Sequence, residues 1–382
     1  MKINTMLKFF PSIAVALLIS CCDDPLPENP TDSYNLDVLW EMQYENNGWG
    51  ADAPPASIND SLLLYTGNDN ISCINIDSGS LKWTSSLEHA GSVLKRFIFD
   101  ESNVFGFRRG NNIYSLDISD GTTIWEKDID SCQSFSFELS IDQEHYFVGI
   151  SSHKVNSPYS IQKYSKSGFL VDSTPTNHMP WILSSSDNKL FCSQGWSPAG
   201  NPNDIGQIIC FDVTSMDTLW YYEGGGSFIH YPIFKDGIMY AGTVWGANNK
   251  ILALNTETGE VIWETGSYGC YQIELVGDTI YYGGGGSVSA LDKNTGQVLW
   301  RTVIPTTDES SPLTYLDGFV YKSHAGSLYI LDATTGEVVH TMRGPDNASV
   351  EQVSTGAGKI FVQSTQHLYA FSPYDPEKDH DN

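Results

Sequence analysis

Short runs of hydrophobic residues, divided by clusters of glycine, asparagine, aspartate and serine, follow one another along the chain after residue 33. Five of these runs end in small residues: LLLYTGNDN, VFGFRRGNN, MYAGTVWGANN, IYYGGGGS and VYKSHAGS. Runs of this length, rich in β-branched and aromatic residues and bounded by turn residues, are typical of β-strands. Long stretches of Ala, Glu, Lys and Leu are missing. The pattern predicts an all-β protein.

One phrase recurs about every 40 residues: an apolar strand, Asp or Asn, a turn ending in Gly, a short strand and then Trp. The Asp or Asn side chain bonds its own backbone to open the turn, and Gly supplies the positive φ that closes it. The Trp then fills the wedge between neighbouring sheets. The copies contain Asp77, Gly79 and Trp83; Asp117, Gly121 and Trp125; Asp212 and Trp220; Asn255, Gly259 and Trp263; Asp292, Gly296 and Trp300; and Asp332, Gly336 and His340.

The copies vary in completeness. The phrase with Asp77 is shortened, and the phrase with Asp212 lacks the glycine. The unit around Ser165 is degenerate, with Gly168 and Val171 standing where Gly and Trp are expected. Counted with these units, the chain holds eight repeats of four strands.

Trp40 precedes any complete unit, and the last unit stops without a Trp strand. A closed ring resolves this offset if the strand near 36–44 completes the blade formed by 359–372, because closure protects edge strands. We therefore predict an eight-bladed β-propeller of four-stranded antiparallel blades over residues 34–375, closed by an N-terminal strand. Residues 376–382 are expected to be a disordered acidic tail.

The chain carries 46 Asp and Glu against 20 Lys and Arg, a formal net charge of −26. Nucleic-acid binding and electrostatic docking on anionic lipid both need clustered basic residues. The charge excludes both functions.

Residues 1–20 are expected to be a signal peptide, because Lys2 and Lys8 precede an apolar stretch too short to span a membrane. Leu18-Ile19-Ser20-Cys21 resembles the bacterial lipobox, which implies diacylation of Cys21. An ordinary signal with a chance cysteine is the alternative. The acidic, Pro-rich residues 21–33 then form a flexible tether. They resemble a surface-export signal only loosely, so the membrane face stays open.

The repeat phrases resemble the PQQ-like propeller repeat, whose consensus is close to L-Y-A-L-D-x-x-T-G-x-x-x-W. The resemblance points most to the lipoprotein propellers of outer-membrane protein assembly, which implies a non-catalytic scaffold for envelope proteins. Quinoprotein dehydrogenases form the other branch. Their vicinal disulfide is not matched by Cys21 and Cys22, which adjoin the lipidation site, and no calcium-ligand set is recognised. We expect no cofactor, no metal and no catalytic residues.

Two composition features have simple structural interpretations. Six cysteines besides Cys21 show no CxxC spacing, so a zinc site is unsupported and most are expected to be buried thiols. The run Gly283–Gly286 lacks the Lys-Ser/Thr of a phosphate loop, and we expect it to let backbones approach closely.

The connections between consecutive blades should emerge on one face of the ring, and they mix aromatic, histidine and carboxylate side chains. Such a ring suits a polar ligand, a sugar or a peptide; packing of these aromatics against the blade ends is the alternative. The candidate binding face consists of Trp49, His89, His178, Trp181, Trp196, His230, Tyr231, Tyr268, Tyr271 and Glu309.

The first functional hypothesis is a scaffold, lipid-anchored to the outer membrane, that binds a barrel or its assembly factors. A carbohydrate- or peptide-binding propeller at the cell surface is the second. A quinone-dependent or other funnel-site enzyme is the third.

Overall fold

The computed structural model describes residues 36–43, 54–67, 70–86, 97–108, 112–129, 138–150, 159–194, 206–224, 232–244, 249–270, 272–284, 286–304, 312–345, 348–364 and 366–381. Tyr34–Asn382 forms one compact unit. The expected signal peptide and tether, with Cys21, lie outside the described residues.

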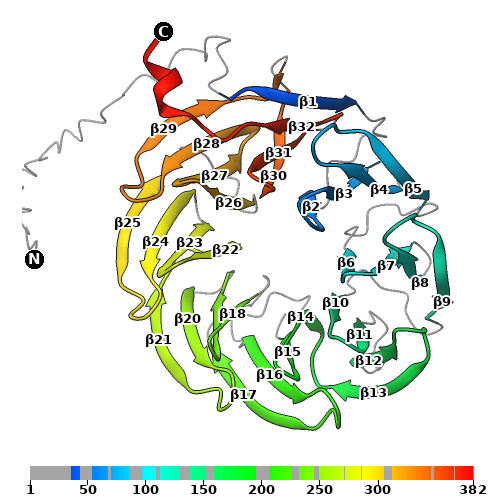
Figure 1. The fold of residues 1–382 in the computed structure, drawn as a ribbon. Coiled ribbons are helices and arrows are strands. Elements are labelled where there is room, and N and C mark those ends of the chain that lie inside the picture. The colour runs from blue at the N-terminus through cyan, green and yellow to red at the C-terminus, as the bar shows by residue number, and fades with distance from the viewer. Residues whose placement is uncertain are drawn as a thin grey trace, which may run out of the picture. The chain divides into compact units, whose positions relative to one another are not determined.

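Tyr34–Asn382 is a ring of eight four-stranded antiparallel sheets, each a blade of a β-propeller (Figure 1). Within each blade the first strand lies nearest the centre of the ring and the fourth lies outermost. The all-β, eight-bladed fold predicted from the repeats is confirmed.

The first four blades hold sixteen strands in chain order. Blade 1 contains β2 (Ala56–Ser57), β3 (Leu62–Gly67), β4 (Asn70–Asn75) and β5 (Leu81–Ser86); blade 2 contains β6 (Phe97–Phe99), β7 (Asn103–Arg108), β8 (Asn112–Asp117) and β9 (Thr123–Asp128). Blade 3 contains β10 (Glu138–Ile141), β11 (His145–Ile150), β12 (Tyr159–Ser165) and β13 (Leu170–Thr176); blade 4 contains β14 (Pro180–Ser186), β15 (Lys189–Gln194), β16 (Gly206–Asp212) and β17 (Thr218–Gly224).

The last four blades repeat this order, except that the N-terminal strand β1 (Val38–Gln43) is the outermost strand of blade 8. Blade 5 contains β18 (Ile233–Lys235), β19 (Ile238–Gly242), β20 (Lys250–Asn255) and β21 (Val261–Gly266); blade 6 contains β22 (Gln272–Val276), β23 (Thr279–Gly284), β24 (Ser287–Asp292) and β25 (Val298–Val303). Blade 7 contains β26 (Leu313–Leu316), β27 (Phe319–His324), β28 (Ser327–Asp332) and β29 (Val338–Met342); blade 8 contains β30 (Val350–Gly356), β31 (Lys359–Ser364) and β32 (His367–Phe371).

The two ends of this unit are joined in blade 8, where β1 pairs antiparallel with β32. Beyond the paired strands, the Asp37 amide donates to Ser372 Oγ at 3.0 Å, and the Ser372 amide donates to the Asp37 carbonyl oxygen at 2.9 Å. The sequence predicted a disordered tail from residue 376. Instead, Pro376–Asp381 form the 3-10 helix η2, and Lys378 Nζ lies 2.6 Å from Asp37 Oδ2.

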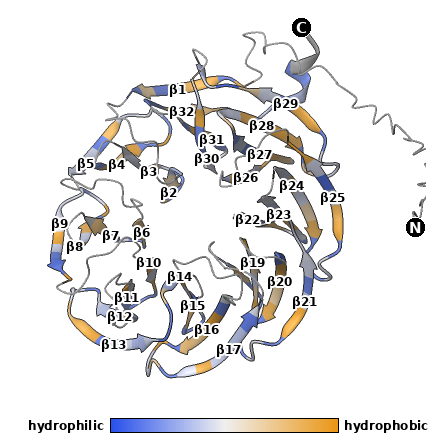
Figure 2. Ribbon diagram, turned by 180° about the vertical axis from the view of Figure 1, so that it is seen from behind, coloured by the Kyte–Doolittle hydropathy of each residue, from blue (hydrophilic) through white to orange (hydrophobic). Residues whose placement is uncertain are grey.

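Eight apolar clusters form the core, and each fills the space between two neighbouring blades. The second and third strands supply most of the buried residues, as in the pattern of β31, where every residue after Lys359 is buried. The outermost strands alternate between buried and exposed residues, and their hydrophobic positions are visible around the rim (Figure 2). Among the described residues, no helix has the length and apolar character needed to cross a membrane.

Candidate functional site

Tryptophan side chains join successive blades. At six junctions the indole Nε1–H of a Trp in an outermost strand donates to a backbone carbonyl oxygen in the turn of the next blade. The pairs are Trp40 with Ile76 at 2.7 Å, Trp83 with Ile118 at 3.0 Å, Trp125 with Lys166 at 2.8 Å, Trp220 with Thr256 at 3.0 Å, Trp263 with Lys293 at 2.8 Å, and Trp300 with Ala333 at 2.9 Å. Each bond satisfies a buried or partly buried carbonyl oxygen and fixes the spacing of two blades.

The indole rings pack directly against the repeat glycines of the next blade. Gly296 has φ +69°, and a Cβ there would overlap the ring of Trp263. Gly121 has φ +73° and meets Trp83 in the same way. Glycine is therefore required at this position for two reasons: the backbone is left-handed, and the indole leaves no room for a side chain.

The repeat Asp and Asn side chains stabilise the turn by accepting hydrogen bonds from its backbone amides. Asp292 Oδ1 accepts hydrogen bonds from the amides of Asn294 and Thr295 and from the Thr295 hydroxyl. The hydroxyl bond is the largest cause that lowers the pKa of this exposed carboxyl, and the two amide bonds lower it further, although desolvation opposes the shift. In blade 1 the sequence interpretation was wrong. Asn75 holds the turn there, accepting from the amides of Asp77 and Ser78, because the phrase is of full length and begins two residues before Asp77.

The junction between blades 3 and 4 has a different chemistry. The register pairs Lys163 with Asp172, as Ser115 pairs with Trp125 in the preceding blade, so Asp172 and not Val171 stands at the Trp position. Val171 is exposed instead. The Val213 carbonyl, equivalent to the indole acceptors, receives a hydrogen bond from Lys163 Nζ at 2.6 Å. Lys163 is only 4% exposed.

The missing glycine of blade 4 belongs to this same junction. Met216 stands at the glycine position with φ +58° and is buried among Phe147, Leu183 and Leu190. No indole from blade 3 approaches this turn, so a side chain occupies the space that the Trp fills elsewhere. The two departures from the repeat therefore compensate one another.

His340 stands at the Trp position of blade 7, in register with Ile330. Its ring stacks on Tyr374 with centroids 6.0 Å apart. Tyr374 is buried, and its amide donates to the Tyr321 hydroxyl at 3.0 Å. The segment after β32 thus packs against blade 7, where the other blades place their repeat turn.

Three members of the candidate binding face are described. His178 is exposed in the connection from blade 3, while Trp181 is half-buried in β14 at an irregularity of its pairing with β15. Tyr268 is 65% exposed in the connection from blade 5 to blade 6. The other members lie outside the described residues: Trp49, His89, Trp196, His230, Tyr231, Tyr271 and Glu309. No hydrogen bond or ring contact joins these three described residues to one another.

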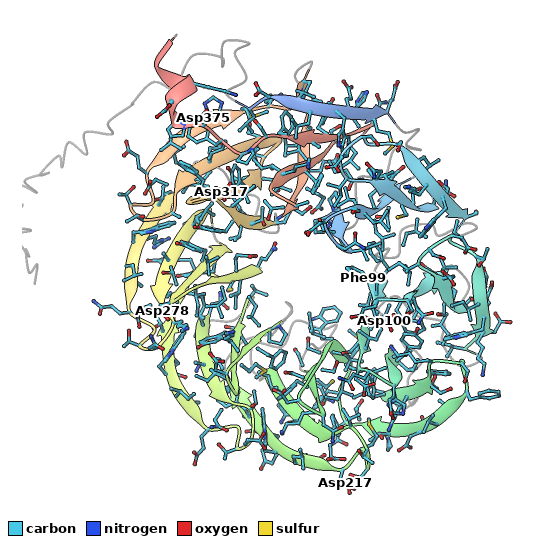
Figure 3. The ribbon with its side chains drawn as sticks, in the orientation of Figure 1. Phe99, Asp100, Asp217, Asp278, Asp317 and Asp375 are labelled. Carbon is cyan, nitrogen blue, oxygen red and sulfur yellow. The ribbon has the colours of Figure 1, made fainter. Side chains whose placement is uncertain are left out.

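The opposite ends of the strands form an acidic face. Because strands alternate in direction, the turns between strands one and two and between strands three and four lie on the same face of the ring. Figure 3 labels an acidic turn residue in each of four blades: Asp100, Asp217, Asp278 and Asp317. Asp375, also labelled, lies between β32 and η2. Lysines pair with some acids of this face, as Lys359 does with Asp77 at 2.9 Å and Lys189 with Glu257 at 2.6 Å.

The innermost strands carry one carboxyl group with a strongly shifted pKa. Burial raises the pKa of Glu274 in β22 to about 7. Its neighbour Gln272 bridges to blade 7, donating to the Leu313 carbonyl at 2.9 Å and accepting from the Leu313 amide at 3.1 Å. Within the described ranges, no three His, Cys, Asp or Glu side chains form a cluster that could hold a metal.

Four cysteines are described, and all are buried free thiols, as expected for most of them: Cys73, Cys192, Cys210 and Cys270. Burial raises the pKa of the Cys270 thiol to about 12, so it is not a reactive thiolate at neutral pH.

Sequence reasoning missed Lys163, Asp172 and Arg301, whose roles depend on neighbouring strands. The sequence offered one sign of Lys163, because it is the only charged residue of the strand YSIQKYS in the unit that lacks Trp. Arg301 follows Trp300 and looks like an ordinary rim residue in the sequence.

Comparisons with known proteins agree with this architecture. A search of curated proteins gives no match. Among solved structures, the crystal structure of BamB from Moraxella catarrhalis has a TM-score of 0.66 at 16% sequence identity, covering 88% of this chain and 97% of that one. A quinohemoprotein alcohol dehydrogenase from Pseudomonas putida has a TM-score of 0.69 at 12% identity, covering 88% of this chain and 76% of that one. At these identities the structures show the fold alone.

The family model described as outer membrane protein assembly factor BamB matches residues 35–156 and 171–378. The gap between the two matched segments, residues 157–170, contains the turn around Ser165 of the degenerate unit, and Asp172, which replaces the repeat Trp, lies just after it. The match covers most of the chain. The chain therefore belongs to the family of outer membrane protein assembly factor BamB.

Proposed function

We propose that this chain is a non-catalytic scaffold, anchored by a lipid on Cys21 to the outer membrane, that binds envelope proteins during outer-membrane protein assembly. The family match over residues 35–156 and 171–378 carries the proposal. The lipobox-like Leu18–Cys21 supports the anchor, since several acyl chains on one residue hold a protein firmly at a bilayer without attraction between charges.

The rigidity of the ring supports the binding part of this proposal. Successive blades are fixed to one another by indole bonds, as at Trp83 and Trp263, which makes a rigid platform. A rigid platform presents loops at constant spacing, and binding to it costs little ordering entropy.

The test is affinity purification of the acylated protein from its native membranes, followed by mass spectrometry of co-eluting proteins. An outer-membrane barrel or its assembly factors should co-elute with the wild type. Cys21→Ala should leave the membrane fraction and lose these partners, if the anchor positions the scaffold. Recovery of no envelope protein by the anchored wild type, or retention of a quinone with Ca²⁺, would overturn the proposal.

The binding face is tested separately. Alanine substitution of Trp181, Tyr231 and Tyr271 together should reduce partner recovery. Unchanged recovery by this folded triple variant would remove the face from the proposal, while the scaffold function would stand.

A further inference from the structure

Among the described residues of this strongly acidic chain, Arg301 is an arginine without an acidic partner. The net charge is −26, and six described lysines each lie within 2.9 Å of a carboxylate oxygen. Arg301 has no ion pair among the described residues. It stacks instead on Tyr268, with the guanidinium carbon 3.4 Å from the ring centroid. The acid of the preceding outermost strand, Glu264, is already paired with Lys250 at 2.8 Å.

The stack is held in place by the strands of blade 6. Tyr282, Ser289 and Arg301 face one another in register across β23, β24 and β25, so their side chains share one face of the blade. Tyr282 is buried, and burial raises its pKa above 10, so the phenol stays neutral and supplies no charge to Arg301.

The glycine run of blade 6 places Tyr268. A Cβ on Gly284 would overlap the Gly269 carbonyl, so the connection from blade 5 lies directly against this strand. Cys270, next in the chain, is fully buried, which anchors the connection. Only a residue without a side chain at position 284 lets Tyr268 reach Arg301. The close approach expected from the glycines thus serves to build the stack.

A stacked guanidinium keeps its planar fork of N–H donors available at the edge of the ring. This geometry matches the two oxygens of a carboxylate, and stacking reduces the entropy lost on binding. Apolar surface lies beside it, because Val303 is two residues further on the same face of β25 and is 70% exposed.

β25 is also the last strand of its sheet. Its outer backbone edge can accept an extended peptide by strand addition. An edge strand, a charged fork and apolar side chains together fit a peptide better than a sugar.

We propose that Arg301, Tyr268 and the edge of β25 form a receptor for a carboxylate carried by an extended peptide segment of a partner protein. The proposal rests on the scaffold function proposed above and adds where on the ring a partner binds. The carboxylate comes from a chain terminus or from an acidic side chain.

The test uses fluorescence anisotropy with three labelled hexapeptides of alternating threonine and valine. One has a free C-terminal carboxylate, one is the C-terminal amide, and one is the amide with an internal glutamate. The free acid, the glutamate peptide or both should bind the full-length protein about tenfold more tightly than the plain amide. Which acid binds identifies the source of the carboxylate.

The variants assign the binding to the stack. Arg301→Gln should remove the difference between acid and amide, and Arg301→Lys should retain only part of it, because lysine lacks the fork. Tyr268→Leu should weaken acid binding while leaving the melting temperature close to that of the wild type. Arg343→Gln is the matched control, since Arg343 is an exposed arginine in the segment after β29.

Equal binding of acid and amide peptides by the wild type would overturn the proposal. So would equal effects of Arg301→Gln and Arg343→Gln, no binding of any peptide at millimolar concentration, or binding of a uronic-acid oligosaccharide in their place. In membrane purification, unchanged partner recovery by Arg301→Gln would overturn the receptor but leave the scaffold function intact.

Discussion

The ammonium group of Lys163 donates a hydrogen bond of 2.6 Å to the carbonyl oxygen of Val213. That carbonyl occupies the place which accepts an indole N–H at six other junctions of the ring. A lysine from the third strand of blade 3 thus replaces a tryptophan from the fourth strand. The degenerate unit keeps the hydrogen bond between blades while losing the residue that defines the repeat.

Lys163→Met should destabilise the protein by about 1–3 kcal/mol, because the variant keeps the length of the side chain but leaves the Val213 carbonyl buried without its donor. Chemical denaturation followed by tryptophan fluorescence measures the change. Lys235→Met removes an exposed lysine and should have an effect within about 0.5 kcal/mol of zero. Equal effects of the two variants would show that the Lys163 bond contributes nothing.

Gly296→Ala should be more harmful than Gly318→Ala, although both glycines have positive φ. A Cβ at Gly318 meets open space, whereas at Gly296 it overlaps the Trp263 ring. We expect about 1 kcal/mol from backbone strain alone at Gly318 and about 2–4 kcal/mol at Gly296.

Melting temperatures of the two glycine variants, measured side by side, test this expectation. In Trp263→Ala, the effect of Gly296→Ala should shrink to that of Gly318→Ala. An undiminished effect in the double variant would mean that the indole is not the cause.

Trp40→Phe and Trp83→Phe should destabilise the protein by similar amounts, about 1–2 kcal/mol each. Both substitutions keep an aromatic ring and remove the N–H that bonds to Ile76 or Ile118. Trp40 belongs to β1, so equal values show that the N-terminal strand closes the ring as firmly as an internal junction. Calorimetric melting is the measurement. A Trp40→Phe variant as stable as the wild type would contradict the claim that β1 closes the ring as firmly as an internal junction.

The repeat phrase could reveal the fold because its chemistry is local. Turn residues such as Asp117 and Gly121 act within one hairpin, and Trp125 follows at fixed spacing, so periodicity in the sequence equals periodicity in space. The residues that the sequence did not reveal depend instead on pairing between strands. Asp172 was missed because a turn one residue shorter shifts the register, and only the pairing with Lys163 reveals it.

The Arg301–Tyr268 stack could not be predicted from the sequence for a related reason. The two residues belong to neighbouring blades, and their contact depends on how closely the connection approaches Gly284. No spacing rule along one strand encodes such a distance. The glycine run did indicate that another backbone segment lies close to this strand, but it did not identify that segment as the connection from blade 5.

Glu274 should make the stability of the protein fall as the pH rises through neutrality. Burial raises its pKa from the ordinary 4.5 to about 7, because the charged form is poorly solvated between the blades. A group with a raised folded-state pKa contributes fully to stability below pH 4.5, and this contribution is lost as the pH rises to about 7. The loss is roughly 3 kcal/mol. Glu274→Gln should therefore be more stable than the wild type at pH 8 and nearly equal to it at pH 4.

Denaturation of the wild type and Glu274→Gln at a series of pH values between these limits checks the sign and the range. The difference in unfolding free energy between them should grow with pH and level off above about pH 7. Glu337→Gln alters an exposed turn carboxylate, and the corresponding difference should stay flat. A difference for Glu274→Gln that does not change with pH would mean that this carboxyl group is solvated in the folded protein, because only a poorly solvated charge couples folding to its protonation.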